Sequence, residues 1–215
     1  MRRQADFRFK LAVCMKALSE RGGLALVFPA TPSQVAQRWF LRTSVNGEMN
    51  QDLVFLGINP SSATQFAPRH NGGDPTTEMV LRSFKVNEDG SPQGWRSMTI
   101  LNLIPIVGQP RNLPIWDGKS GRQAIIESVE ITRHILRVVL PESYCLHLMW
   151  GNPGDKNFPW KRAVLEQLTP EIGRLFPPAG RVQAYISKSE YPLRPGFGGL
   201  HHWRAKPLRE ARHLL

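Results

Sequence analysis

Apolar and polar residues follow one another along this chain in blocks that predict strands separated by helices. Four short apolar runs, each followed by residues that favour turns, predict buried strands. These runs are residues 53–57, 98–106, 145–150 and 181–186. Helix-length segments separate them, which implies right-handed crossovers between parallel strands. The expected fold is therefore α/β, a three-layer sandwich with a central, mainly parallel four-stranded sheet and helices on both faces.

Apolar residues at helical spacing predict helices over residues 7–18 and 120–140, and residues 24–28 are consistent with a further short strand. Asp74 and Pro75 predict a helix start, because Asp is a favoured N-cap and Pro is favoured at the first helical position. Three further helices are expected. The first begins with the Thr-Pro-Ser-Gln pattern at 31–34 and carries Trp39 and Phe40. The second is capped by Asn157 and ended by Pro170, and the third is a basic helix over 203–214.

Length and composition favour one domain that spans residues 1–215, with residues 1–50 as a helical lead-in packed on the same core. No run approaches the roughly 20 apolar residues of a membrane span, and the first residues lack the pattern of a signal peptide. We therefore expect a cytoplasmic protein without a membrane partner. The two cysteines are far apart, and phosphate-loop, dinucleotide and zinc motifs are absent from the sequence, so neither a metal nor a cofactor is expected.

The net charge is strongly positive, since 28 Lys and Arg face 17 Asp and Glu and leave +11. A balance of this kind favours a polyanionic partner, of which nucleic acid is the commonest for a soluble protein. The basic residues are scattered along the chain, so any basic face must be assembled by folding. A basic surface that serves solubility alone is the alternative.

Polar residues at the carboxyl end of the first central strand form the leading candidate site, because open α/β sheets bind ligands at this edge. Asn59 is expected at the lip of the sheet, with a solvent-facing amide that contributes little to the core. Gly57 permits a close approach of a ligand, and Pro60 ends the strand. Asn102 places an amide in the middle of an apolar strand, where either neighbouring backbone or a ligand must satisfy it. Phe66 lies in the loop 64–73, where it could stack on a base.

Four short motifs, in this order, resemble those of the uracil-DNA glycosylase superfamily. Leu-Gly-Ile-Asn-Pro at 56–60 is similar to the first motif of its mismatch-specific branch, in which the Asn positions water. Ile-Leu-Asn-Leu at 100–103 resembles the strand whose Asn recognises the flipped base, and residues 148–151 resemble the Leu-Leu-Trp-Gly strand. Residues 196–203 resemble the Gly-Phe-Phe-Gly segment before the last helix.

A closer resemblance is to a bacterial and phage family of unassigned function. Its marks are Asn-Pro-Ser-x-Ala, Asp-Pro-Thr, a Trp-rich turn and an Asn-Leu strand. They correspond here to residues 59–63, 74–76, Trp95 and 102–103.

The superfamily resemblance implies a monofunctional DNA glycosylase that acts on a flipped-out base in double-stranded DNA, with water as the nucleophile and no lyase step. We expect it to act as a monomer. The implied catalytic residues are Asn59, Ser61 and Tyr191, and the implied substrate-binding residues are Gly57, Ile58, Pro60, Phe66, Asn102, Asn152, Ser187 and Ser189. The implied DNA-binding residues are Arg69, His70, Arg194, His201, His202 and Arg204.

Ser61 stands where the uracil-specific branch has a bulky Tyr that blocks pyrimidine C5. Its small side chain predicts a C5-substituted pyrimidine as substrate, including a bulky base of the phage type. The biological setting, whether repair, antiviral defence or phage biology, is left open.

The chain departs from the superfamily at the second motif, where residues 191–195 stand in place of His-Pro-Ser or Asn-Pro-Ser. The usual catalytic His is therefore not in register. Two alternatives stay open: a nucleic-acid-binding protein of the same fold that has lost catalysis, and a hydrolase of free nucleosides or nucleotides.

Overall fold

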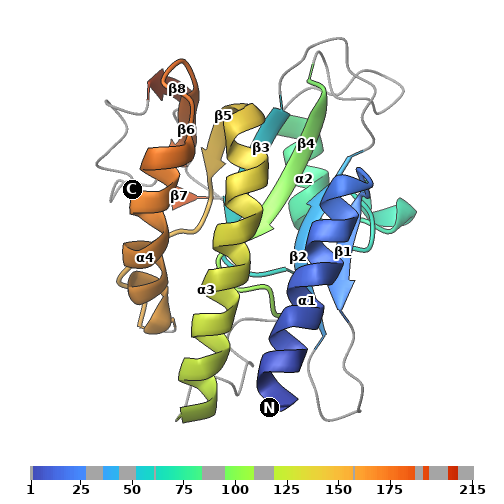
Figure 1. The fold of residues 1–215 in the computed structure, drawn as a ribbon. Helices are drawn as coiled ribbons and strands as arrows, with labels where there is room; N and C mark the ends of the chain where they lie inside the picture. The colour runs from blue at the N-terminus through green and yellow to red at the C-terminus, as the bar shows by residue number, and fades with distance from the viewer. Residues whose placement is uncertain are drawn as a thin grey trace.

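A mixed β-sheet with helices on both faces makes up the described part of the chain, as Figure 1 shows. The computed structural model describes residues 2–27, 36–43, 52–60, 62–83, 95–108, 119–156, 158–186, 191–193 and 203–207. The helices are α1 (Arg2–Ser19), α2 (Pro75–Ser83), α3 (Lys119–Val139) and α4 (Trp160–Leu175), with single 3₁₀ turns at Arg69–Asn71 and Leu140–Glu142. The strands are β1 (Leu24–Val27), β2 (Gln37–Arg42), β3 (Asp52–Gly57), β4 (Ser97–Asn102), β5 (Ser143–Leu148), β6 (Arg181–Ile186), β7 (Pro192–Leu193) and β8 (Trp203–Pro207).

The strands pair in the order β1-β2-β4-β3-β5-β6-β7, and β8 pairs with β6. The four central strands β4, β3, β5 and β6 are parallel to one another, whereas β1 pairs antiparallel with β2, β2 with β4, and both β7 and β8 with β6. The prediction of an α/β fold is confirmed. The prediction of a four-stranded sheet is not, because eight strands are present in the described residues alone.

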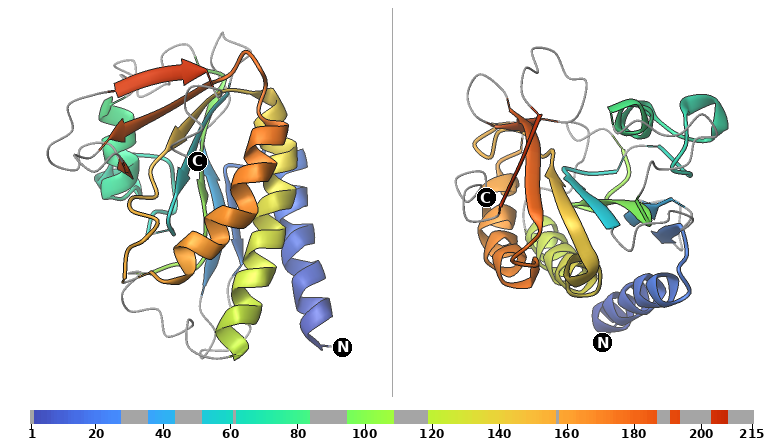
Figure 2. Two further views of the ribbon diagram at one scale, coloured as in Figure 1. Left: turned by 90° about the vertical axis from the view of Figure 1, so that its left-hand side faces the viewer. Right: turned by 90° about the horizontal axis from the view of Figure 1, so that it is seen from above.

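The two faces of the sheet are covered by different helices. In Figure 2, α1, α3 and α4 lie on one face and α2 lies on the other. Alternate side chains of β3 pack on the two faces of the sheet. Val54 and Leu56 belong to the larger apolar core with α3 and α4, whereas Leu53 and Phe55 belong to the smaller core with α2. All six residues of β3 are therefore buried, as expected of a parallel strand covered on both faces.

Strand β2 corrects the helix predicted after Pro32. Residues 31–35 lie outside the described residues, but Gln37–Arg42 pairs with both β1 and β4. The middle of this strand is buried on both sides, so hydrophobic residues follow one another without the alternation that marks a strand in a sequence. Residues 1–50 therefore contribute strands β1 and β2 as well as helix α1, rather than a helical lead-in alone.

Three other boundaries also differ from the prediction. Asn102 is the last residue of β4, not a residue in its middle. Pro170 lies inside α4 without ending it, and Asn157 lies outside the described residues. Because proline has no backbone N–H, the carbonyl group one turn before it lacks its helical hydrogen bond. Pro170 is exposed, so water can solvate that carbonyl group. Residues 203–207 form β8 rather than the start of a helix, because they pair with β6.

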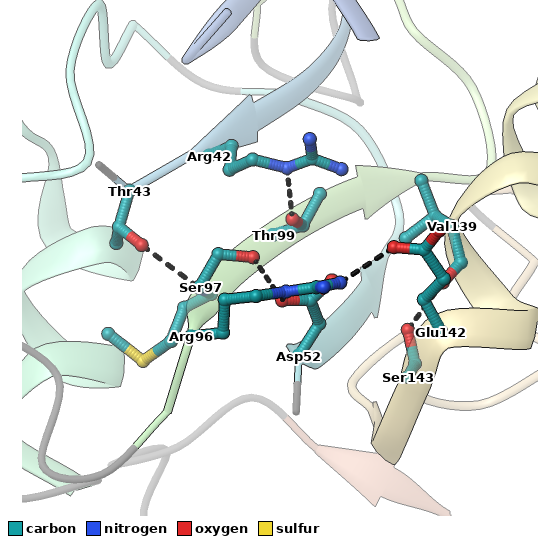
Figure 3. Close-up of polar contacts among 10 residues, drawn as sticks. Arg42, Thr43, Asp52, Arg96, Ser97, Thr99, Val139, Glu142 and Ser143 are labelled. Carbon is teal, nitrogen blue, oxygen red and sulfur yellow. Dashed lines mark hydrogen bonds and ion pairs between the residues drawn. The ribbon is translucent and has the colours of Figure 1, made fainter. Parts of the chain in front are cut away.

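A polar cluster joins the amino ends of the central strands (Figure 3). Arg96 donates from Nε and Nη2 to the two carboxylate oxygens of Asp52, at 2.9 and 2.6 Å. Its Nη2 also donates to Glu142 at 2.6 Å, and the Ser97 hydroxyl donates to Asp52 at 2.8 Å. The charged side chains at the amino-end edge of the sheet are thus paired with one another.

None of the described helices is both long enough and apolar enough to cross a membrane.

Candidate functional site

Gly57, Asn102 and Met149 lie side by side where β3, β4 and β5 end. Gly57 is the register partner of Asn102 in the parallel β3–β4 pair, and the Met149 amide donates to the Leu56 carbonyl at 3.0 Å. A Cβ placed on Gly57 would lie 3.2 Å from the Met149 methyl and 3.7 Å from the Asn102 Oδ1. Met149 belongs to the smaller core, so the three residues lie on the face of the sheet that α2 covers.

The side-chain amide of Asn102 is buried and incompletely satisfied. The residue is 3% exposed, and its Nδ2 has no hydrogen-bond partner among the described residues. A buried donor left without a partner costs about 1–3 kcal/mol. An unpaired amide at the carboxyl edge of a parallel sheet is therefore suited to bind a polar ligand group.

Asn59 does not present a free, solvent-facing amide, and this corrects the expectation from the sequence. Its Nδ2 lies 3.2 Å from the Pro60 carbonyl, 3.2 Å from that of Ile106 and 2.7 Å from that of Gly108. The side chain is half-buried and ties the turn after β3 to the segment after β4. Because Nδ2 faces carbonyl groups, Oδ1 is the end of the amide that remains to accept a hydrogen bond.

The turn after β3 also contains Ile58 and Pro60, two of the predicted substrate-binding residues. Ile58 is half-buried and packs against the larger core, and Pro60 is buried. The Pro60 carbonyl accepts a hydrogen bond from the Gly108 amide at 3.2 Å. The side chains of both residues therefore support the turn from its inner side.

The loop 64–73 is a compact unit held between β3 and α2. The amides of Thr64 and Gln65 donate to the Gly72 carbonyl at 2.9 and 3.2 Å, and the Gly73 amide donates to Pro68 at 3.1 Å. Gly72 has a φ of 83°, in the left-handed region that glycine adopts more readily than residues with a side chain. A Cβ on Gly73 would lie 1.6 Å from the Ala67 carbonyl oxygen, so the backbone packs where a side chain would have to be.

Phe66 projects from this loop, is half-buried and packs against the smaller core that contains Met149. The loop ends at Asp74, whose Oδ1 accepts the Thr77 amide at 2.8 Å, and this confirms the predicted N-cap of α2. Phe66 is thereby held against the smaller core by a loop that is fixed at both ends.

Arg69 and His70 are exposed on the 3₁₀ turn of the loop. Arg69 Nε lies 3.3 Å from a carboxylate oxygen of Glu78, which also pairs with Arg82 at 2.7 Å. Both residues can reach solvent, but the charge of Arg69 is partly balanced by Glu78. Their contact with phosphate remains a prediction.

The sequence analysis missed Arg38, a buried cation beneath the turn. It is 3% exposed, and its Nη1 donates to the Ala63 carbonyl. Burial lowers the pKa of Arg38 to about 10, and Asp74 partly opposes this shift. Arg38 Nε and Asp74 Oδ2 are buried without hydrogen-bond partners among the described residues. The only signal in the sequence is a basic residue next to Trp39, Phe40 and Leu41.

Asn152 is exposed, and its side chain shapes its own turn by accepting the Gly154 amide at 2.7 Å. Its carbonyl accepts a hydrogen bond at 3.0 Å from Lys161, a second buried cation that the sequence analysis missed. Lys161 is 1% exposed, with Nζ 4.8 Å from the centre of the Phe158 ring. Burial lowers the pKa of Lys161, and Asp155 opposes the shift. The hydrogen bond from Lys161 to the Asn152 carbonyl holds the turn after β5 against the start of α4.

Tyr191 is half-buried and directly precedes β7. The Gly151 amide donates to the Pro192 carbonyl at 2.7 Å, and β7 pairs with Tyr185 and Ile186. This pairing places the Tyr191 segment at the carboxyl ends of β5 and β6. Ser61, Ser187, Ser189, Arg194, His201 and His202 lie outside the described residues, and Arg204 lies in β8.

Gly57, Asn59 and Asn102 thus lie together where β3 and β4 end, with Phe66 on the same side of the sheet as Asn102. Within the described ranges, no three His, Cys, Asp or Glu side chains gather as metal ligands would. The groups gathered there are the buried amide of Asn102, the amide oxygen of Asn59, the ring of Phe66 and the thioether of Met149. They suit a flat polar molecule with an apolar face, such as a nucleobase.

Comparison with known proteins places the chain beside one family. The family model described as "Protein of unknown function (DUF1643)" matches residues 38–175. The match runs from β2 to the end of α4 and includes Asn59, Phe66 and Asn102. No curated protein and no solved structure matches the chain.

Proposed function

The chain belongs to the family described as a protein of unknown function (DUF1643), and we propose that it is a monofunctional DNA glycosylase. It hydrolyses the N-glycosidic bond of a flipped-out modified or C5-substituted pyrimidine in double-stranded DNA and leaves an abasic site. The proposal includes action as a monomer in the cytoplasm. It also includes a fold of the uracil-DNA glycosylase type, and the four adjacent parallel strands with helices on both faces support that part of the proposal.

The observation that carries the proposal is the unpaired amide of Asn102. Its Nδ2 is buried at the carboxyl edge of the sheet and has no partner among the described residues. A flipped pyrimidine offers carbonyl oxygens and ring nitrogens along its Watson–Crick edge. An amide can donate to one of these groups and accept from the next, so Asn102 would recognise the base by this edge.

Three further features support the same proposal. Asn59 Oδ1 is the free end of an amide whose Nδ2 is held by backbone carbonyls, so it can orient a water molecule without moving. Phe66 is half-buried in a pinned loop and can stack on a base. The net charge of +11 suits a partner that is a polyanion.

In the proposed reaction the water oxygen bonds to C1′ of the sugar, and the electron pair of the C1′–N bond leaves with the base. The proton that the water loses passes to solvent, and the departing base anion takes up a proton from solvent. Asn59 Oδ1 accepts a hydrogen bond from the attacking water. Asn102 Nδ2 donates to the base and stabilises the negative charge that develops as the base departs.

A second candidate is a nucleic-acid-binding protein of the same family without catalysis. One observation favours it, because Tyr191 stands near the position of the usual histidine in the sequence. A hydrolase of free nucleosides is disfavoured, because a small substrate has no need of a charge of +11.

Base release from synthetic duplexes tests the proposal. Duplexes that carry uracil, a thymine mismatch, 5-hydroxymethyluracil or a glucosylated pyrimidine are incubated with the protein and then cleaved with alkali at abasic sites. Asn102→Leu removes the amide but keeps the volume, and the control Gln167→Leu removes an exposed amide from α4. We expect release by the wild type and by Gln167→Leu, and a loss of at least about 100-fold in Asn102→Leu. Equal release by both variants would remove Asn102 from the site.

Binding at several salt concentrations separates the two candidates from a small-molecule enzyme. The logarithm of the affinity for duplex DNA should fall with the logarithm of salt concentration, with a slope of about −0.9 per phosphate contact. Steep salt dependence without base release would favour the binding protein. Flat salt dependence would remove DNA as the partner.

A further inference from the structure

Met149 occupies the place from which a side chain can limit the size of a base bound at Asn102. It follows β5 directly, is 6% exposed and belongs to the smaller core on the α2 face of the sheet. Its amide is fixed to the Leu56 carbonyl at 3.0 Å, so its backbone cannot move away from β3.

The Met149 methyl occupies the place directly over Gly57, beside the Asn102 amide. The three nearest atoms to a Cβ placed on Gly57 are the Met149 Cε at 3.2 Å, the Asn102 Oδ1 at 3.7 Å and the Met149 Cγ at 3.8 Å. Gly57 itself contributes no side chain there. A flat group that approaches the Asn102 amide over Gly57 must therefore displace the Met149 methyl.

A methionine at this position makes an adjustable boundary. Its side chain is unbranched, has three rotatable bonds and carries no group that must be hydrogen-bonded. It can therefore withdraw from a large substituent or fill the space beside a small one. A β-branched residue of similar size would hold one rotamer and leave one fixed shape.

We propose that Met149 is a specificity-determining residue that sets which pyrimidine substituents fit beside the base held by Asn102. The inference rests on the proposed function, since it assumes that Asn102 binds the base. It predicts a range of accepted bases rather than one base, because the methyl of Met149 can adopt several positions. Ser61 lies outside the described residues and carries no part of this argument.

The test compares base release by Met149→Ile and Met149→Ala with release by the control Met98→Ile. Met98 is a fully buried methionine of the same core, but it lies at the start of β4, opposite Leu53 and four residues before Asn102. The measured quantity is the ratio of kcat/KM for a glucosylated 5-hydroxymethyl pyrimidine to kcat/KM for uracil. We expect the ratio to fall at least 10-fold in Met149→Ile, to rise in Met149→Ala and to stay within about twofold in Met98→Ile.

A second readout is independent of catalysis. In protein with ¹³C-labelled methionine methyl groups, a duplex that carries 5-hydroxymethyluracil should shift the methyl resonance of Met149, assigned with Met149→Ile, and should leave that of Met98 in place. Base release with unchanged ratios and an unshifted Met149 signal would overturn the inference but keep the glycosylase. A shifted Met149 signal without base release would keep the inference and overturn the glycosylase. If neither release nor a shift occurs, both are wrong.

Discussion

Asn59 and Gly108 are joined by a hydrogen bond of 2.7 Å from the side-chain Nδ2 to the backbone carbonyl. The two residues follow different strands, so this bond connects the carboxyl end of β3 to the chain that continues from β4. The Gly108 amide returns the connection by donating to Pro60 at 3.2 Å. The turn that carries the candidate site is therefore held by the Asn59 side chain and by several backbone hydrogen bonds, including that from the Ile104 amide to the Ile58 carbonyl at 2.9 Å.

Substitution of Asn59 should destabilise the protein, contrary to what a surface position would suggest. Asn59→Ala removes the donor from three carbonyl groups and should lower the free energy of unfolding by about 1–3 kcal/mol. Asn59→Asp should cost more, because a carboxylate would face those carbonyls. Urea denaturation measures both, with exposed Asn71→Ala as the control. Equal stability of Asn59→Ala and Asn71→Ala would show that these bonds contribute nothing.

Arg96 should matter more for stability than its partner Glu142. Arg96→Ala leaves Asp52, which is 5% exposed, as a buried carboxylate without its cation, and should cost about 3 kcal/mol. Glu142 has a side chain that is 65% exposed, so Glu142→Gln should cost less than about 1 kcal/mol. Chemical denaturation at neutral pH compares the two variants. Similar losses would contradict the buried Asp52–Arg96 pair as the main interaction.

His147 should make the folded protein sensitive to acid. It is fully buried in β5, with ring centres 5.3 Å from Phe55 and 5.8 Å from Tyr185. Burial lowers its pKa from 6.5 to about 3. The unfolded chain therefore binds the proton more readily between these values, and stability should fall as the pH drops from 6.5 towards 3.

The loss from His147 should reach about 1.4 kcal/mol per pH unit within that window. Urea unfolding at pH 7, 5.5 and 4.5 measures it in the wild type and in His147→Gln. Carboxylates titrate in both proteins, so the difference between the two slopes isolates the histidine. Identical slopes would mean that the imidazole can be protonated in the folded state.

Two glycines should respond in opposite directions to the same substitution. Gly73→Ala places a methyl 1.6 Å from the Ala67 carbonyl oxygen, so the loop 64–73 must move and stability should fall by more than about 2 kcal/mol. Gly173 lies exposed in α4 with open space around it, and Gly173→Ala should stabilise by about 0.5–1 kcal/mol. Thermal unfolding measures both. An unchanged Tm for Gly73→Ala would show that the loop has an alternative conformation of equal energy.

The parallel centre of the sheet and the main helices follow from local patterns in the sequence. Strand β6 has the predicted bounds 181–186, and α3 differs from its predicted helix by one residue at each end. Buried central strands are apolar throughout, and amphipathic helices repeat every 3.6 residues, so neighbouring residues carry the information. The N-cap at Asp74 is equally local, because it depends on residues 74–77 alone.

The edge strands and the chemistry of the site depend on residues far apart in the chain. The local sequences of β2 and β8 favoured helices. These residues form strands because β2 pairs with β1 and β4 and because β8 pairs with β6. Asn59 lies 49 residues from Gly108, and no local pattern tells which end of its amide is occupied. Arg38 and Lys161 are cations that the sequence would place at the surface, yet both are buried. Pairing and desolvation are decided by what packs against a residue, and for this site only the tertiary structure determines that.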